Sequence, residues 1–177
     1  RQIELIRQAL PRHTRISAVF GPGSAVELER ARTLMESRNL KLVSESLQGD
    51  SELFAALQRV MSGSDAFLAL PDAQVINPDT VQNLLLTSFR FRIPVVGYSA
   101  SSVRAGATLA LFSSPQQIGQ QAGEVARQLL RSGILPAPQY PRYFTVQTNR
   151  HMANSLNLGI DDDASLKERL QKQERDG

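Results

Sequence analysis

The sequence contains no cysteine, which excludes disulfide bonds, thiolate catalysis and cysteine-ligated metal sites. Histidine is scarce as well, because His13 and His151 are the whole set and neither stands in a spacing that zinc sites use. No apolar run approaches the roughly 18 residues that a membrane span requires. We therefore expect neither a metal centre nor a membrane-spanning helix.

A concentrated block of positive charge is also missing. The net charge is only +3, and the basic residues are scattered along the chain. The nearest approach to a patch is Arg1, Arg7, Arg12 and Arg15. Nucleic-acid binders usually gather such residues on one face, so we interpret these arginines as a solvated surface and expect no nucleic-acid partner. With 41% hydrophobic and 21% charged residues in 177, the chain is expected to be globular.

The first 99 residues alternate between strand-like and helix-like patterns. A short helix is expected over residues 3–10. The expected strands are 15–21, 40–47, 65–72 and 93–99, with helices beginning near Ser24, Ser51 and Asn77. The uninterrupted apolar run within the third strand is typical of a strand buried on both faces. This order predicts an α/β fold in which an open parallel sheet carries helices on both faces.

The pattern changes after Ser99. A loop leads into a strand at 108–112, and a capping box at Ser114 begins a helix over 115–131. A proline-rich connector, a strand at 144–149 and a short helix follow. The charged tail 161–177 has only Leu166 and Leu170 as an apolar pair, so we expect a marginal, solvated helix there.

The helix over 115–131 carries an apolar stripe that includes Ile118, Val125 and Leu129. Because each buried apolar side chain contributes roughly 1.5–3 kcal/mol, we expect this helix to be docked, either on the 1–95 region or on a second copy. Gly119 and Gly123 lie four residues apart on the helix. Since glycine costs about 1 kcal/mol in a helix relative to alanine, the pair favours close backbone approach to another element.

Ligands of parallel α/β sheets bind at the carboxyl ends of the strands. Four expected loops lie there: 21–24, 48–50, 71–73 and 98–100. The first loop, Gly21-Pro22-Gly23, lacks the third glycine of a dinucleotide fingerprint, so no nucleotide cofactor is expected. No motif places a base beside Ser24, which favours a helix-capping role over a nucleophilic one.

Two acidic residues of these loops, Asp50 and Asp72, could form a metal-binding pair of the phosphotransfer receiver type. Such a domain needs an acidic pair after its first strand and a lysine after a late one, and neither is present. Asp72 alone has two interpretations that local sequence leaves open. It is either turn chemistry after a strand or a carboxylate that accepts a ligand's donor. Tyr98 is equally open, as a stacking partner or a rim residue.

In this order the segments resemble the substrate-binding proteins of ABC transporters, namely the uncharacterised periplasmic components that include tryptophan/phenylalanine-binding members. The resemblance is carried by "ELIRQALPRHTRISAVFGPGS", "DAFLALPDAQVINPDTVQNLLL", "RIPVVGYSASSVRAGATLALFSSPQQIGQQAGEVARQLL" and "FTVQTNRHMANSLNLGI". It covers roughly residues 2–160. It implies the type I periplasmic-binding-protein fold, in which two α/β lobes joined by hinge strands clamp a ligand.

The resemblance implies that residues 1–99 form one ligand-binding lobe, the C-terminal one. Residues 100–160 are then expected to cross over, complete the other lobe and return, and 161–177 to be the charged tail. The ligand-binding residues it implies are Pro22, Gly23, Ser24, Asp72, Ala73, Tyr98 and Ser99. The segment Gly97–Ala100 lacks the acid that amino-acid-binding members commonly place there, which leaves open a neutral or hydroxyl-rich ligand.

The function implied is non-enzymatic binding of a small molecule for an ABC permease in the periplasm. The chain begins at Arg1 rather than Met, so we expect a signal peptide to be absent from this sequence. One alternative is a periplasmic sensory or interaction module with the same fold and a signalling partner. Another is an enzyme on a Rossmann-like sheet. A homodimer through the 115–131 helix also remains open.

Overall fold

The computed structural model describes residues 1–47 and 52–176. In this part of the chain, six strands form one sheet: β1 (Arg15–Phe20), β2 (Lys41–Ser46), β3 (Ala66–Leu68), β4 (Val95–Gly97), β5 (Leu109–Phe112) and β6 (Thr145–Thr148). The strand order is β2-β1-β3-β4-β5-β6. The pairs from β2 to β5 are parallel, and only β6 runs antiparallel to its neighbour. The expected α/β fold and its strands are confirmed.

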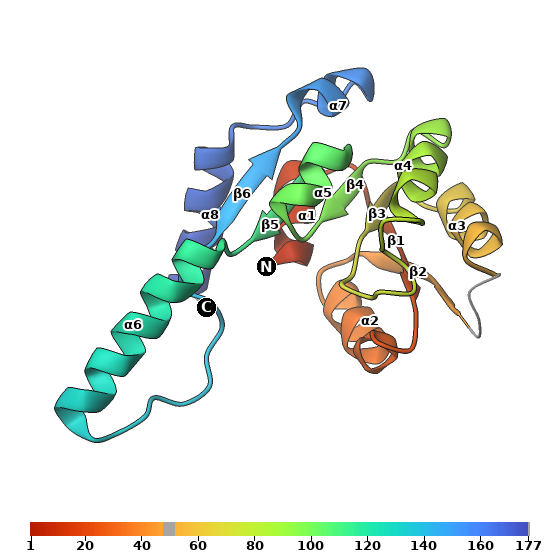
Figure 1. Cartoon of the computed structure of the whole chain (residues 1–177). Helices are drawn as coiled ribbons and strands as arrows, with labels where there is room; N and C mark the ends of the chain where they lie inside the picture. The colour runs from red at the N-terminus through yellow and green to blue at the C-terminus, as the bar shows by residue number, and fades with distance from the viewer. Residues whose placement is uncertain (48–51, 177) are drawn as a thin grey trace.

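Helices cover both faces of this sheet (Figure 1). They are α1 (Gln2–Ala9), η1 (Ala25–Glu27), α2 (Leu28–Glu36), α3 (Leu53–Ser62), α4 (Val81–Arg90), α5 (Ala100–Ala105), α6 (Pro115–Ser132), α7 (Arg150–Ser155) and α8 (Asp163–Asp176). Buried side chains of α1, α2 and α8 pack on one face of the sheet, while those of α3 and α4 pack on the other.

The buried strands place apolar side chains alternately on the two faces of the sheet. Ala66 and Leu68 face the α1 side, and Phe67 between them faces the α3 side. Successive side chains of a strand point to opposite faces, so an unbroken apolar run is what a sheet covered on both sides requires. This confirms the interpretation of the run that begins at Phe67.

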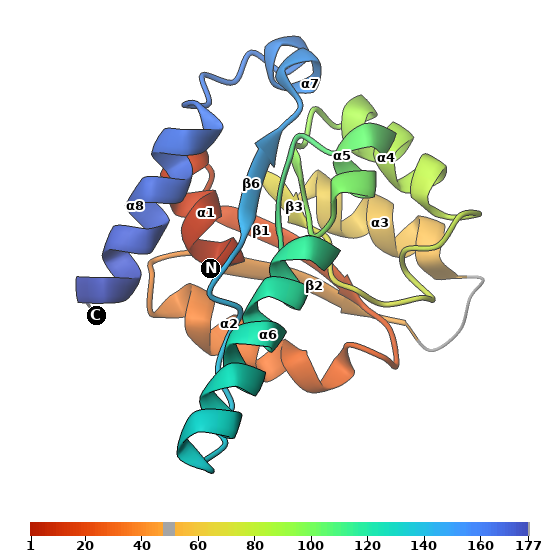
Figure 2. The same cartoon turned by 60° about the vertical axis from the view of Figure 1, so that its left-hand side comes forward.

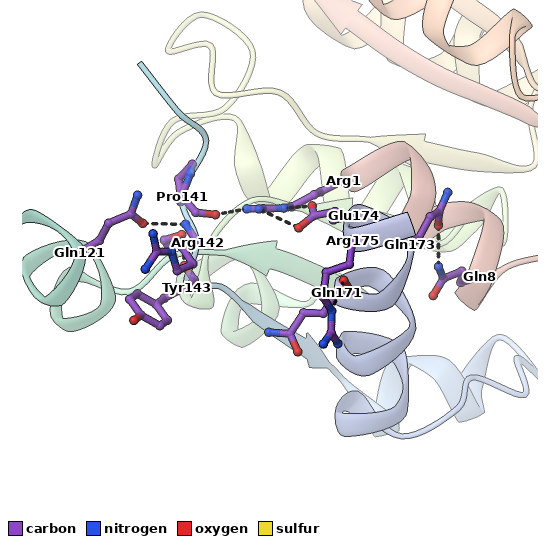
Figure 3. A network of polar contacts seen from close by, with 11 residues as sticks. Arg1, Gln8, Gln121, Pro141, Arg142, Tyr143, Gln171, Gln173, Glu174 and Arg175 are labelled. Atoms are coloured by element: carbon purple, nitrogen blue, oxygen red, sulfur yellow. Dashed lines mark hydrogen bonds and ion pairs between the residues drawn. The ribbon is translucent and has the colours of Figure 1, made fainter. Parts of the chain in front are cut away.

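Helix α8 corrects the expectation of a solvated tail. Leu166 is 0% exposed and Leu170 is 2% exposed, because both join the core beneath α1. Polar contacts extend this docking, since Arg1 donates hydrogen bonds to Glu174 and Gln8 donates to Gln173 at 3.2 Å (Figure 3). Two leucines one helical turn apart are thus enough to seat a highly charged helix when the partner surface is already apolar.

Helix α6 departs from the expectation of docking on the 1–95 region. None of its residues is buried, and Figure 1 shows it projecting from the sheet body, with residues 133–143 returning alongside it. Within the described residues, no other element closely approaches its glycines: nothing lies within 4 Å of a Cβ placed at Gly119, and at Gly123 the neighbour is the Arg127 side chain of the same helix, at 3.8 Å. The capping box is confirmed, since Ser114 and Gln117 each bond the other's backbone N–H.

Two local expectations change as well. The segment after Ser99, expected to be a loop, contains α5. Helix α4 begins at Val81 rather than just after Asn77, because the Asn77 side chain accepts from the Asp79 and Thr80 amides and holds a turn. The sheet continues past residue 99, where β5 and β6 extend it. Figure 2 shows the lower end of α6 and its return segment extending below the sheet body.

Candidate ligand-binding site

The residues expected at the site come from three neighbouring strands. β1, β3 and β4 are consecutive in the sheet and parallel, so their carboxyl ends meet at one edge. The loop after β1 supplies Pro22, Gly23 and Ser24, the loop after β3 supplies Asp72 and Ala73, and the loop after β4 supplies Tyr98 and Ser99. The loop at 48–50, which follows β2, lies outside the described residues.

The sheet topology singles out the gap between β1 and β3. After β1 the chain moves outward to β2, and after β2 it crosses back to β3 on the other side of β1. At such a switch point the two following loops run in opposite directions and open a crevice above the sheet. Gly21–Ser24 and Pro71–Ala73 are the two loops that border this point, so the sequence-predicted residues share the edge where ligands of this topology bind.

Asp72 connects these two loops. It is only 3% exposed. Its Oδ2 accepts a hydrogen bond from Ser24 Oγ at 2.8 Å, and its Oδ1 accepts from the Gln74 amide at 3.0 Å. Both carboxylate oxygens therefore have partners within the protein. The turn chemistry considered for Asp72 is present, together with a link across the switch point that the sequence did not indicate.

Glycine at position 21 is required by this arrangement. A Cβ built at Gly21 would lie 2.6 Å from Asp72 Oδ1, closer than two unbonded atoms approach, and one at Gly23 would lie 3.3 Å from Oδ2. Because the carboxylate is buried and hydrogen-bonded, it cannot move aside cheaply. The Gly-Pro-Gly sequence thus serves close packing of the loop onto Asp72, which is a different use from cradling a dinucleotide.

Hydrogen bonding sets the charge of Asp72. Burial by itself raises the pKa of a carboxyl group, but the bonds from the Ser24 hydroxyl and the Gln74 amide outweigh it and leave the pKa of Asp72 below its ordinary value. Asp72 is therefore ionised at neutral pH. Its negative charge is buried beneath the loops, where the Ser24 hydroxyl and the Gln74 amide donate hydrogen bonds to it.

Ser24 has a different role from the expected helix cap. Its side chain makes no capping hydrogen bond to the helix that follows. The hydroxyl instead donates to Asp72 and accepts from the Gly21 amide at 3.2 Å. Because a hydroxyl has a single proton, its donation to Asp72 fixes its orientation. Ser24 and Asp72 together hold the loop after β1 against the loop after β3.

The third loop is organised by the start of α5. Ser99 caps this helix, since its Oγ accepts from the Ser102 amide at 3.1 Å. Gly97 has no room for a side chain, because a Cβ there would lie 2.1 Å from Ser102 Oγ. Tyr98 is half-buried against the core on the α3 side, and this burial raises the pKa of its phenol. Sequence signals for α5 were present, in a serine before it and Gly106 after it.

The described residues include no group of three or more His, Cys, Asp or Glu side chains that could hold a metal ion. Within the same residues, no helix is long and apolar enough to cross a membrane. In the loops after β1 and β3, Pro22, Gly23, Pro71 and Ala73 are exposed, with Tyr98 and Ser99 half-exposed beside them.

The comparison with protein families agrees with this geometry. The model for the family described as ABC transporter substrate binding protein matches residues 1–167. The chain belongs to this family. The substrate-binding fold accounts for the switch point and for the loops of three parallel strands meeting at one edge.

The proteins that this chain resembles are longer than it is. It is 26% identical over 129 residues to an uncharacterised protein of Rickettsia prowazekii, covering 72% of this chain and 42% of that protein. A conserved domain protein from Vibrio cholerae is 26% identical with a TM-score of 0.71. An ABC domain from Streptococcus pneumoniae, solved in complex with L-Trp, is 18% identical with a TM-score of 0.70. Each structural match covers 94% of this chain and 57% of the other, so this chain spans about half the length of its relatives.

Proposed function

We propose that this chain is the ligand-binding lobe of the substrate-binding component of an ABC-type uptake system, acting in the periplasm without catalysis and delivering its ligand to a permease. The observation that carries the proposal is the meeting of the loops after β1, β3 and β4 at one edge of the sheet, with the first two bordering the switch point between β1 and β3. Internal hydrogen bonds hold two of these loops before any ligand arrives. A preorganised edge of this kind loses little entropy on binding.

The state of Asp72 bears on the class of ligand. Its oxygens are occupied by Ser24 and Gln74, so a ligand ammonium group would have to compete with bonds already made. We assign Asp72 and Ser24 as positioning residues. Contact with the ligand falls to the exposed surface of Pro22, Gly23 and Ala73 and to the ring of Tyr98. This arrangement favours a neutral or hydroxyl-rich molecule over an α-amino acid.

The α6 arm, defined as residues 114–143, supplies the second part of the proposal. Ile118 is 56% exposed, and Leu130 is 86% exposed. An apolar groove of about 440 Å³ runs between α6 and its return segment, lined by side chains that include Val125 and Leu135. Apolar grooves of this size usually meet another surface. The relatives are longer than this chain, which leaves room in them for a second lobe. We propose that such a lobe packs against this arm and forms the other wall of the ligand cleft.

Chemical-shift mapping tests the ligand edge, because a single lobe is expected to bind weakly. The labelled chain is titrated with a panel of sugars, polyols and amino acids that includes L-tryptophan. We expect a sugar or polyol to shift resonances at 22–24, 72–73 and 98–99. Tyr98→Ala should abolish the shifts, and Tyr140→Ala, on the exposed arm, should leave them unchanged. Shifts confined to another surface, or insensitive to Tyr98→Ala, would contradict the proposed site.

Two measurements test the proposed role of the arm. In sedimentation, we expect the isolated chain to be a monomer. In fluorescence, we expect the exposed arm to bind an environment-sensitive apolar dye. Val125→Asp in the groove should reduce dye binding, while Glu36→Asp on α2 should not. A stable dimer that Val125→Asp dissociates would show that a second copy covers the arm and would contradict a second lobe as its partner.

A further inference from the structure

A second groove lies between helices α4, α5 and α7. Helices α4 and α5 lie side by side with α7 at their end (Figure 2), and together they line an apolar groove of about 400 Å³. Leu85, Leu86 and Phe89 come from α4, Ala105 and Gly106 from the end of α5, and Met152 from α7. The lining residues of α4 extend from Gln82 to Phe89, and those of α5 lie at its end, where the chain leads away from the ligand edge. An occupant of this groove would leave the ligand edge free.

The apolar side chains of this groove are unusually accessible. Leu86 is 57% exposed and Phe89 is 50% exposed, and Phe91 lies exposed one residue beyond α4. Single exposed apolar residues are common, but several around one concavity indicate an interaction surface. Met152 adds an unbranched side chain that adapts to different partners.

The charged side chains of the three helices that line the groove are basic. The helices α4, α5 and α7 contain no aspartate or glutamate. Arg90 and Arg104 stand next to groove residues in the chain, and Arg92 follows in the turn after α4. Among the described residues, the side chains of these three arginines make no hydrogen bond or ion pair. A partner with negative charge would supply the counter-charges that the fold leaves out.

The concave shape and the charge together indicate the kind of partner. An amphipathic helix lays its apolar face into a groove of this type. An exposed apolar surface on α6 includes Arg127 and Arg131, and its docking into this groove would bring like charge to Arg90, Arg92 and Arg104. A second copy that docks through α6 is therefore a poor occupant. We propose that the groove between α4, α5 and α7 binds an acidic amphipathic helix of a partner protein.

Fluorescence anisotropy with designed helical peptides tests this interaction. One labelled peptide carries leucines along one face and glutamates along the other, and its matched control has lysines in place of glutamates. We expect the glutamate peptide to bind at least about tenfold more tightly, and its binding to weaken with added salt. Equal binding of the two peptides, or no binding of either, would overturn the proposal.

Two pairs of variants locate the binding. The triple variant R90E/R92E/R104E should weaken binding of the glutamate peptide by about tenfold or more. The control R12E/R127E/R131E changes the net charge equally and should leave binding unchanged. Leu86→Ser should weaken binding, and Leu130→Ser, on the α6 arm, should not. Equal losses in both members of a pair would show that the groove is not the binding surface.

Two further measurements separate other occupants. Anionic phosphatidylglycerol vesicles should not bind the chain under the conditions in which the glutamate peptide does. The chain should also show no self-association that Leu86→Ser relieves. Vesicle binding that needs the three arginines would overturn the proposal and indicate a membrane surface as the occupant. A dimer that Leu86→Ser dissociates would overturn it in favour of a second copy. Circular dichroism verifies that every variant keeps the fold.

Discussion

The sheet body and the α6 arm use similar helical patterns with different results. In the body, α3 buries Leu53, Ala56, Leu57, Val60 and Met61 against the sheet. In the arm, α6 is as amphipathic as α3 and is capped at both ends, by Ser114 and by Gly133, yet it buries no residue. An amphipathic pattern therefore specifies that a helix has an apolar face, but not that the same chain supplies a surface to cover that face.

The contacts that hold the arm are also of a different kind. Tyr143 donates a hydrogen bond to Glu124 at 2.6 Å, and Arg142 pairs with the same carboxylate at 3.2 Å. Arg1 donates a hydrogen bond to the carbonyl of Pro141 (Figure 3). Exposed ion pairs contribute little, because water and salt screen them. The body is stabilised by buried apolar area, whereas the arm depends on its own helix and on polar contacts at its base.

The largest expected difference between body and arm comes from removing a leucine side chain. Leu166→Ala should lower the free energy of unfolding by about 2–5 kcal/mol, because Leu166 is fully buried beneath α1 and its loss leaves a cavity. Leu130→Ala on the arm should change it by less than about 0.5 kcal/mol, because the side chain is already in water. Urea unfolding measures both. A small effect of Leu166→Ala would mean that α8 is solvated after all.

A smaller effect is expected from the link between the two loops. Asp72→Asn should lower the free energy of unfolding by about 1–3 kcal/mol at neutral pH, because the donors that face Asp72 lose a charged acceptor. Asp79→Asn, at an exposed position, should have almost no effect. Chemical unfolding of the two variants beside the parent protein measures the difference.

The pH dependence of this link has a defined direction. The pKa of Asp72 is lowered in the folded state, so its stabilisation is fully present above the ordinary pKa near 3.8 and is lost as the pH falls through the lower folded value. The difference in the free energy of unfolding between the parent protein and Asp72→Asn should therefore become smaller in strong acid. A difference that stays constant through that range would show that the carboxylate charge does not contribute.

The smallest effect is expected within the arm itself. Gly119→Ala should stabilise α6 by about 1 kcal/mol, because nothing lies near the added methyl group and alanine favours the helix. Gly133→Ala should destabilise the helix end by a similar amount, about 1 kcal/mol, because its φ of 69° suits glycine. Hydrogen exchange of α6 amides reports both changes. Faster exchange in Gly119→Ala would show that the glycine is needed for a contact within this chain.

The sequence was sufficient for the α/β class and for the order of strands along the chain, and it proposed the loops of the candidate site. Alternating patterns gave the strands, and the topology rules placed the loops after β1, β3 and β4 at one edge. It was insufficient for α8, because Leu166 and Leu170 are too few to indicate burial without knowledge of the surface beneath α1. It also missed α5, although Ser99 and Gly106 mark its ends.

Local sequence determined which residues could cap, turn or line a strand, since those preferences depend on neighbours within a few positions. It offered Ser24 as a helix cap and Asp72 as a turn residue. Only the tertiary structure decided that these two side chains, 48 positions apart in the chain, meet at 2.8 Å across the switch point. It likewise decided that α8 is covered and α6 is not, because burial depends on which surfaces the whole chain brings together.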